Sequence, residues 1–145
     1  MIKLAKSTLF ALYAMMELAR SPDEPISTAS IAERYGISPH HLAKVMQQLS
    51  RRGLVQSIRG AGGGHRLARS PKNITLFDVV EIFEGPALPE EECLVADPGA
   101  LCPARGDCDL KQVFDEIGEQ VYFTLQSISL ETLVRRQRHP QRHKV

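Results

Sequence analysis

The sequence lacks a hydrophobic run long enough to cross a membrane. Its most apolar stretch, LFALYAMM at 9–16, is far shorter than the roughly 20 residues of a spanning helix. Lys3 and Lys6 precede this stretch as they would in a secretory signal, but Glu17 and Arg20 follow it at once and no convincing small-residue cleavage site is present. We therefore expect a buried helix in a cytoplasmic protein.

Patterns typical of catalysis and of nucleotide binding are also absent. The five histidines are scattered, and no serine, histidine and aspartate stand at a recognisable catalytic spacing. Neither a P-loop nor the glycine pattern of a dinucleotide site occurs, and no repeat or low-complexity tract is visible. We therefore expect that the protein is not an enzyme.

The charges are distributed unevenly along a chain that is long enough for one core with an appendage. Residues 28–72 carry one acid, Glu33, against eight basic residues: Arg34, Lys44, Arg51, Arg52, Arg59, Arg66, Arg69 and Lys72. Residues 73–110 carry one base, Arg105, against nine acids: Asp78, Glu81, Glu84, Glu90, Glu91, Glu92, Asp97, Asp107 and Asp109. The basic part is typical of a polyanion-binding surface, from which the acidic part should be held away.

The first predicted helix runs from about Thr8 to Arg20. Ser7 or Thr8 is the expected N-cap. Four apolar residues at helical spacing are expected to form its buried stripe: Leu9, Leu12, Tyr13 and Met16.

A helix-turn-helix is predicted directly afterwards. Its first helix begins after Ser27 and stops at Gly36, which can adopt the left-handed conformation that ends a helix. The residues expected to face inward are Ile31, Ala32 and Tyr35. Ser38 is the expected N-cap of the next helix, and Pro39 stands in its first turn, where proline is tolerated. Two helices joined by so tight a turn form a helix-turn-helix.

The second helix of this motif has two distinct faces. Its predicted buried face comprises Leu42, Val45, Met46 and Leu49. The opposite face carries donors and cations without a carboxylate: His40, Lys44, Gln47, Gln48 and Arg51. Gln pairs with adenine edges, and Lys or Arg pairs with guanine or phosphate, so this face suits a DNA groove. The alternative is the ordinary solvated face of an amphipathic helix.

A β-hairpin wing is predicted after Gly53. The stretch LVQSI at 54–58 predicts a strand, and RGAGGGHRLAR at 59–69 places four glycines between arginines. Glycines at the tip permit positive φ and would let the backbone lie against phosphate or in a minor groove. Arg59 and Arg66 would be the flanking contacts, whereas His65 has the alternative of being a plain strand residue. The full set of predicted DNA contacts is Ser38, Pro39, His40, His41, Lys44, Gln47, Gln48, Arg51, Arg59, Gly62, Gly63, Gly64, His65 and Arg66.

Two further helices are predicted beyond the wing. One starts at Thr75, has Asp78 as its capping-box partner and ends at Gly85; its apolar stripe is Leu76, Val79, Val80 and Phe83. The other begins at about Asp109 and carries an apolar seam: Leu110, Phe114, Ile117, Val121, Leu125 and Ile128. A lone helix cannot bury such a seam on a small domain, so we infer a homodimer. Ser129 starts a short helix, LETLV, before the basic tail RRQRHPQRHKV.

All three cysteines lie between these two helices, in the proline- and glycine-rich stretch 91–110. Cys93, Cys102 and Cys108 have the spacing C-x8-C-x5-C, which lacks the C-x-x-C pairs of zinc ribbons, and their odd number argues against disulfides. The last two precede a helix N-terminus, where unpaired N–H groups stabilise an anionic centre such as an iron–sulfur cluster. Three thiolates leave one iron with an exchangeable ligand, which suits a sensor. Structural zinc, a bare thiol switch and buried apolar cysteines are the alternatives.

This succession of elements resembles the Rrf2 family of bacterial transcription regulators. The resemblance rests on the wing VQSIRGAGGGHRLAR, the helix ITLFDVVEIFEG, the loop ending CDLKQVF and the helix ending SLETLV, and it covers the chain from Lys3 to about Val134. It implies a homodimeric winged helix-turn-helix protein whose helix from about Pro39 to Arg52 reads DNA. It also implies that the three cysteines are iron–sulfur ligands. The ending LCPARGDCDLKQVF looks most like the nitric-oxide-sensing members.

Two positions depart from the pattern of that family. Lys111 stands where some members have a histidine, and Leu9 stands where the nitric-oxide-sensing members have a carboxylate donated across the dimer. The fourth ligand and the cluster type, 4Fe-4S or 2Fe-2S, therefore stay open. Glu92, Asp107 and Asp109 are the nearby candidates.

Taken together, these features predict a mainly α fold with a small β-hairpin wing and a long C-terminal dimerisation helix. The predicted parts are a DNA-binding domain at 1–85, a cluster-binding loop at 86–109, a dimerisation region at 110–134 and a disordered basic tail at 135–145. The predicted function is repression from a palindromic operator, controlled by an iron–sulfur cluster that senses nitric oxide, redox state or iron. The alternative is a cluster-free winged-helix repressor that senses through cysteine thiols or a small ligand.

Overall fold

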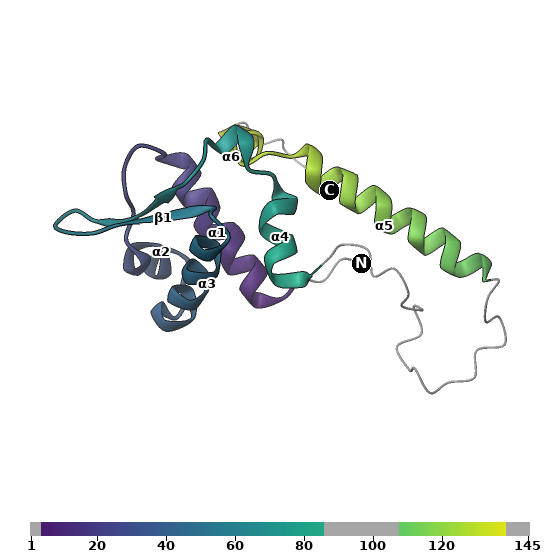
Figure 1. Ribbon diagram of the computed structural model, residues 1–145, viewed down its shortest axis with the longest axis horizontal. Coiled ribbons are helices and arrows are strands. Elements are labelled where there is room, and N and C mark those ends of the chain that lie inside the picture. The colour runs from purple at the N-terminus through teal and green to yellow at the C-terminus, as the bar shows by residue number, and fades with distance from the viewer. Residues whose placement is uncertain (1–3, 86–107, 139–145) are drawn as a thin grey trace.

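The computed structural model describes residues 4–85 and 108–138. Along the chain its elements are α1 (Lys6–Arg20), α2 (Thr28–Tyr35), α3 (Pro39–Arg51), β1 (Val55–Ile58), β2 (Gly64–Leu67), the 3-10 helix η1 (Pro71–Asn73), α4 (Leu76–Glu84), α5 (Asp109–Ser127) and α6 (Leu130–Arg138). A helical body carries the β1–β2 hairpin on one side, and α5 extends from it on the other (Figure 1). This architecture confirms the predicted fold class. Residues 135–138 of the predicted disordered tail belong to α6, whereas Cys93, Cys102 and residues 139–145 lie outside the described residues.

α1 lies at the centre of the body, where it contacts α2, α3, α4, α6 and β2. Its fully buried apolar side chains are Ala11, Ala14, Met15 and Leu18. The predicted buried stripe was therefore wrong in part, because Leu9 and Tyr13 are each 37% exposed. Alanines let neighbouring helices approach closely, so the most crowded side of a surrounded helix is not the side with the largest residues.

The predicted N-cap of α1 was also wrong. The helix begins at Lys6, with Ala5 at the N-cap position and no side-chain cap. Thr8 is fully buried, and its hydroxyl donates to the carboxylate of Glu84 at the end of α4. The same carboxylate accepts the Ala5 N–H at 2.8 Å. The negative charge of Glu84, from α4, therefore lies at the start of α1. A negative charge is electrostatically favourable at a helix N-terminus.

The helix-turn-helix forms as the sequence predicts. Ser27 caps α2 by accepting the Ser30 N–H at 3.1 Å, and Gly36 ends that helix in the left-handed conformation, with φ 63°. Pro39 occupies the first turn of α3, although Ser38 makes no side-chain cap hydrogen bond. The residues of α3 that are buried are those predicted: Leu42, Val45, Met46 and Leu49.

A buried carboxylate of α1 holds α2 through an ion pair with an exposed arginine. Glu17 of α1 is 5% exposed, and its carboxylate lies 2.6 Å from Arg20 Nη1 and 2.9 Å from Arg34 Nε of α2. The hydrogen bond with Glu17 raises the pKa of Arg20 above its ordinary value. Because a buried carboxylate is costly without a cation, Glu17 fixes the first helix of the motif to the centre of the body.

α4 begins with the predicted capping box. Thr75 Oγ1 accepts the Asp78 N–H at 3.2 Å, and the Asp78 carboxylate accepts the Thr75 N–H at 2.8 Å. Each side chain thus satisfies the backbone of the other at the helix start.

Thr75→Ala is expected to lower the free energy of unfolding by about 0.5 to 2 kcal/mol, because the Asp78 N–H loses its acceptor. Denaturant unfolding followed by circular dichroism measures the change. Thr124→Ala is the matched control, since the Thr124 hydroxyl donates within α5 to the carbonyl of Gln120 and caps nothing. Equal losses in the two variants would contradict the role of the capping box.

α5 leaves the body with its apolar side chains uncovered. None of its residues is buried, and five large apolar side chains are exposed: Leu110, Val113, Phe114, Ile117 and Phe123. It contacts α4, where Phe77 packs edge-to-face on Tyr122 with ring centroids 4.8 Å apart. Within the described ranges, no helix combines the length and the apolar character that a membrane span requires.

α6 brings the chain back to the body. The Ile128 carbonyl accepts the Leu76 N–H at 2.9 Å, and the Leu130 N–H donates to the Ile74 carbonyl at 2.8 Å. Leu130 is fully buried and Val134 is 7% exposed, both in the core cluster that surrounds α1. The short helix after Ser129 therefore completes the hydrophobic core of the body.

Candidate nucleic-acid interface

The outward face of α3 is polar and free of carboxylates. Because four apolar residues of α3 face the core, the opposite side lies in solvent. The predicted contact residues of this segment are all exposed: Ser38, Pro39, His40, His41, Lys44, Gln47, Gln48 and Arg51. α3 contains no acid, so a polyanion that approaches this face meets amides, imidazoles and cations without a like charge.

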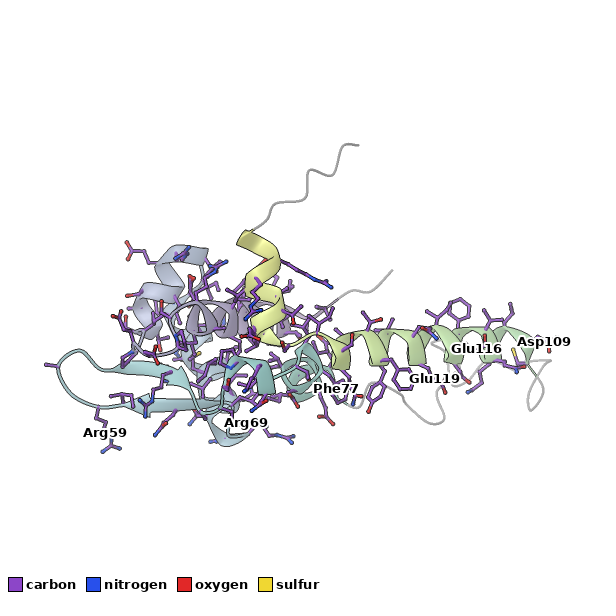
Figure 2. All side chains as sticks on the ribbon, turned by 90° about the horizontal axis from the view of Figure 1, so that it is seen from above. Arg59, Arg69, Phe77, Asp109, Glu116 and Glu119 are labelled. Atoms are coloured by element: carbon purple, nitrogen blue, oxygen red, sulfur yellow. The ribbon has the colours of Figure 1, made fainter. Side chains whose placement is uncertain are left out.

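β1 and β2 form the predicted wing, an antiparallel hairpin beside α3. The register pairs Gln56 with Arg66 and Ile58 with Gly64. Arg59 follows β1 and is exposed; Figure 2 shows its side chain projecting from the hairpin. Arg66 is also exposed, and its Nε donates to Gln56 Oε1 at 3.4 Å. The wing therefore presents two guanidinium groups to solvent.

The residues that lead into β2 become less exposed along the chain. Gly62 is exposed, whereas Gly63, Gly64 and His65 are half-buried. Burial lowers the pKa of His65, whose Nδ1 lies 3.3 Å from Ser57 Oγ on the opposite strand. His65 is therefore biased towards the neutral form and held within the hairpin, unlike the two arginines.

Three further exposed basic residues follow α3 or the wing in the chain and were not among the predicted contacts. Arg52 stands at the C-cap of α3, while Arg69 and Lys72 lie between β2 and α4; all three are exposed. Their charge was the sequence signal that could have identified them. Ile26, which pairs with the wing through an isolated bridge to His65, gave no such signal because the pairing is distant in sequence.

The carboxylates of α5 lie away from the basic surface. This helix carries Asp109, Asp115, Glu116 and Glu119. Figure 2 shows Asp109 and Glu116 towards the far end of α5, at the opposite end of the molecule from Arg59. The separation agrees with the charge asymmetry of the sequence, because a polyanion bound at α3 and the wing avoids these carboxylates.

Of the three cysteines, Cys108 falls within the described residues. It is a free, half-buried thiol at the N-cap position of α5. Residues 4–85 and 108–138 contain no group of three or more metal-binding side chains, and Cys93 and Cys102 lie outside these ranges. A thiol at a helix N-terminus is a donor of the type that holds an anionic iron–sulfur cluster, so Cys108 fits the predicted group.

A comparison with protein families decides what kind of helix-turn-helix protein this is. The model of the Rrf2 family, described as iron-dependent transcriptional regulators, matches residues 4–136. The chain belongs to the Rrf2 family. As an Rrf2 protein it is a DNA-binding transcriptional regulator, which accounts for the polar face of α3 and the arginines of the wing.

Several relatives of this Rrf2 protein have been named. BadM of Rhodopseudomonas palustris is 40% identical over 134 residues, which cover 92% of this chain and 82% of BadM. The transcriptional repressor NsrR of Streptomyces coelicolor is 33% identical over 135 residues, covering 92% and 88% of the two chains. Among solved structures, CymR of Bacillus subtilis, called its global cysteine regulator, has a TM-score of 0.77 and 32% identity over 92% of this chain and 97% of CymR. IscR of T. potens has a TM-score of 0.76 and 28% identity over 99% and 94%.

Proposed function

We propose that this Rrf2 protein is a homodimeric repressor whose binding to a palindromic operator is controlled by an iron–sulfur cluster held by Cys93, Cys102 and Cys108. The observation that carries the proposal is the position of Cys108, which begins the one described helix that leaves its apolar side chains uncovered. The cluster ligand and the dimer contact thus share one element.

DNA reading is assigned to α3 and the wing. A recognition helix inserts its exposed side into the major groove, where Gln47 and Gln48 can pair with adenine edges and Lys44 with guanine or phosphate. Arg59 and Arg66 of the wing supply contacts to the flanking backbone. Occupation of a promoter by these elements would block transcription.

Dimerisation is assigned to α5. Leu110, Val113, Phe114 and Ile117 are each 48% to 69% exposed and lie along one side of the helix. Such a stripe on an arm that stands away from the body needs a partner, and a second copy of α5 offers the same stripe. Two bodies joined in this way would place two α3 helices for successive major grooves of a palindromic site.

The link between sensing and DNA binding runs through α5. A cluster bound there supplies an iron centre that nitric oxide, oxidants or iron shortage can damage. Cys108 occupies the N-cap position of α5, while at the other end Ile128 and Leu130 are hydrogen-bonded to Leu76 and Ile74 around the start of α4. A change at Cys108 therefore alters the start of the dimer helix relative to a fixed end. A coupling of about 1 to 3 kcal/mol would change operator affinity roughly 5- to 150-fold.

Cys108→Ser is expected to abolish cluster binding and to shift operator affinity by about 5- to 150-fold while the fold is kept. The protein is purified or reconstituted anaerobically, and iron, acid-labile sulfide and visible thiolate-to-iron absorption are measured. Affinity is measured on a duplex that the wild-type protein selects from a randomised pool. Gln112→Ser is the matched control, because it changes an exposed side chain one turn further along α5 and removes no thiol.

The second candidate is a cluster-free repressor that senses through its thiols. It is favoured by the likeness to CymR, which is named a cysteine regulator. Anaerobic wild-type protein that is colourless, lacks sulfide and still binds the selected duplex fully would reject the cluster and favour this candidate. Retention of a complete cluster by Cys108→Ser would reject the assigned ligand.

A further inference from the structure

We propose that Gly64 is a positioning residue for DNA binding: it lets β2 rest directly on Ile26 and thereby sets where the wing holds Arg59. The inference rests on the proposed reading of DNA by the wing. It assigns the glycine requirement at this position to a contact inside the protein, in contrast to the sequence prediction, which assigned the wing glycines to close approach of DNA.

The contact between the wing and Ile26 is an isolated antiparallel bridge. The His65 N–H donates to the Ile26 carbonyl at 2.8 Å, and the Ile26 N–H donates to the His65 carbonyl at 2.9 Å. Ser27, the next residue, is the N-cap of α2. The start of β2 is therefore joined to the residue that precedes the N-cap of the first helix of the helix-turn-helix.

Gly64 is the point of closest approach in this contact. A Cβ atom built on Gly64 would lie 2.5 Å from the Ile26 carbonyl oxygen, 2.6 Å from its carbon and 2.9 Å from the Ser27 nitrogen. The obstructing atoms are backbone, so no side-chain rotation relieves the clash. The φ of +155° is also one that residues with a Cβ rarely adopt.

A side chain at Gly64 would displace β2 and, with it, the tip of the wing. To restore an ordinary contact of 3.4 Å, β2 and Ile26 must separate by about 1 Å, from 2.5 Å. β1 is paired with β2 along the whole hairpin, so the displacement passes to the tip that carries Arg59. Charged hydrogen bonds are favourable over only about 0.5 Å of donor–acceptor distance, so a shift of this size weakens a phosphate contact.

The test is a double-mutant cycle between Gly64→Ala and Arg59→Ala, with affinity for the selected duplex measured by fluorescence anisotropy over a range of salt concentrations. Arg59→Ala is expected to reduce the slope of log Kd against log salt concentration by about 1, as for the loss of one phosphate contact. Gly64→Ala is expected to weaken binding about 3- to 10-fold, as when one charged hydrogen bond is strained. In the Arg59→Ala background the same change should weaken binding less than about 2-fold, because the positioned group is gone.

Gly53→Ala is the matched control. Gly53 also has a positive φ, +70°, but nothing lies within 4 Å of its Cβ position, so it brings backbone strain without displacing β2 from Ile26. If Gly64→Ala does not fold, Ile26→Pro provides the second variant, because it deletes the N–H donated to His65. It should show the same coupling to Arg59.

Equal losses from Gly64→Ala in both backgrounds, or no loss at all, would overturn the positioning role while leaving DNA reading by the wing intact. An Arg59→Ala variant with wild-type affinity and salt dependence would overturn the wing contact itself, and the inference with it.

Discussion

Replacing Lys44 and Gln48 together by alanine is expected to weaken operator binding by about 2 to 6 kcal/mol, or roughly 30- to 25,000-fold, because each base contact contributes about 1 to 3 kcal/mol. Both side chains are exposed on the outer face of α3 and neither supports the core, so the fold should be unchanged. The arm at Cys108 is remote from them in the chain, and cluster content should also be unchanged.

The loss is measured on the selected duplex and on a scrambled duplex of the same length. Specific affinity should fall further than affinity for the scrambled sequence, since a lost base contact reduces discrimination whereas a lost phosphate contact does not. A chemically matched control is Lys6→Ala with Gln112→Ala, which removes one exposed cation and one exposed amide from other helices. A comparable loss in that control, or less than about 3-fold loss in the α3 variant, would place the recognition surface elsewhere.

Leu130→Ala is expected to lower the free energy of unfolding by about 2 to 5 kcal/mol, because it leaves a cavity in a fully buried position. Such a loss is a large part of the roughly 5 to 15 kcal/mol that stabilises a small domain. Leu130 belongs to the stretch 128–130 that pairs with residues 74–76, and its side chain packs in the cluster around α1. The expected cost therefore measures how much the C-terminal helix contributes to the DNA-binding body.

Denaturant unfolding at a fixed protein concentration gives this value, since the proposed dimerisation would make stability depend on concentration. Leu9→Ala is the matched control: it is the same substitution at a leucine that is 37% exposed. A smaller loss there is expected. A larger loss from Leu9→Ala than from Leu130→Ala would support the predicted buried stripe of α1 and contradict the packing of α6.

The sequence predicted the buried face of α3 correctly and that of α1 only in part, for one physical reason. α3 packs on one side only, so its apolar and polar residues separate and periodicity reveals both Leu42 and Lys44. α1 is surrounded by other elements, and its alanines mark the closest contacts, so the large residues Leu9 and Tyr13 pointed to the wrong side. Local capping rules were similarly right for Thr75 and wrong for Thr8, whose partner Glu84 is 76 residues away.

The candidate DNA surface was predictable because exposed charge is visible in the sequence, whereas the contact between the wing and Ile26 was not. The bridge between Ile26 and His65 joins segments that no local pattern connects, so the glycine at 64 invited a different explanation. Cys108 fell at the start of a helix as expected. The ligand roles of Cys93 and Cys102 stay predictions from their spacing and from the family resemblance.

Gly85 ends the nine-residue helix α4, and the Ile128 carbonyl accepts the N–H of Leu76 at the other end of the same helix, about 13 Å away. Residues 86–127 are thus inserted between two nearby points of a body whose hydrophobic core is completed by α6. A chimaera that exchanged residues 86–127 for the corresponding stretch of another Rrf2 regulator would keep its operator while answering to a different stimulus. In such a molecule the stimulus and the recognised operator sequence can change independently during evolution.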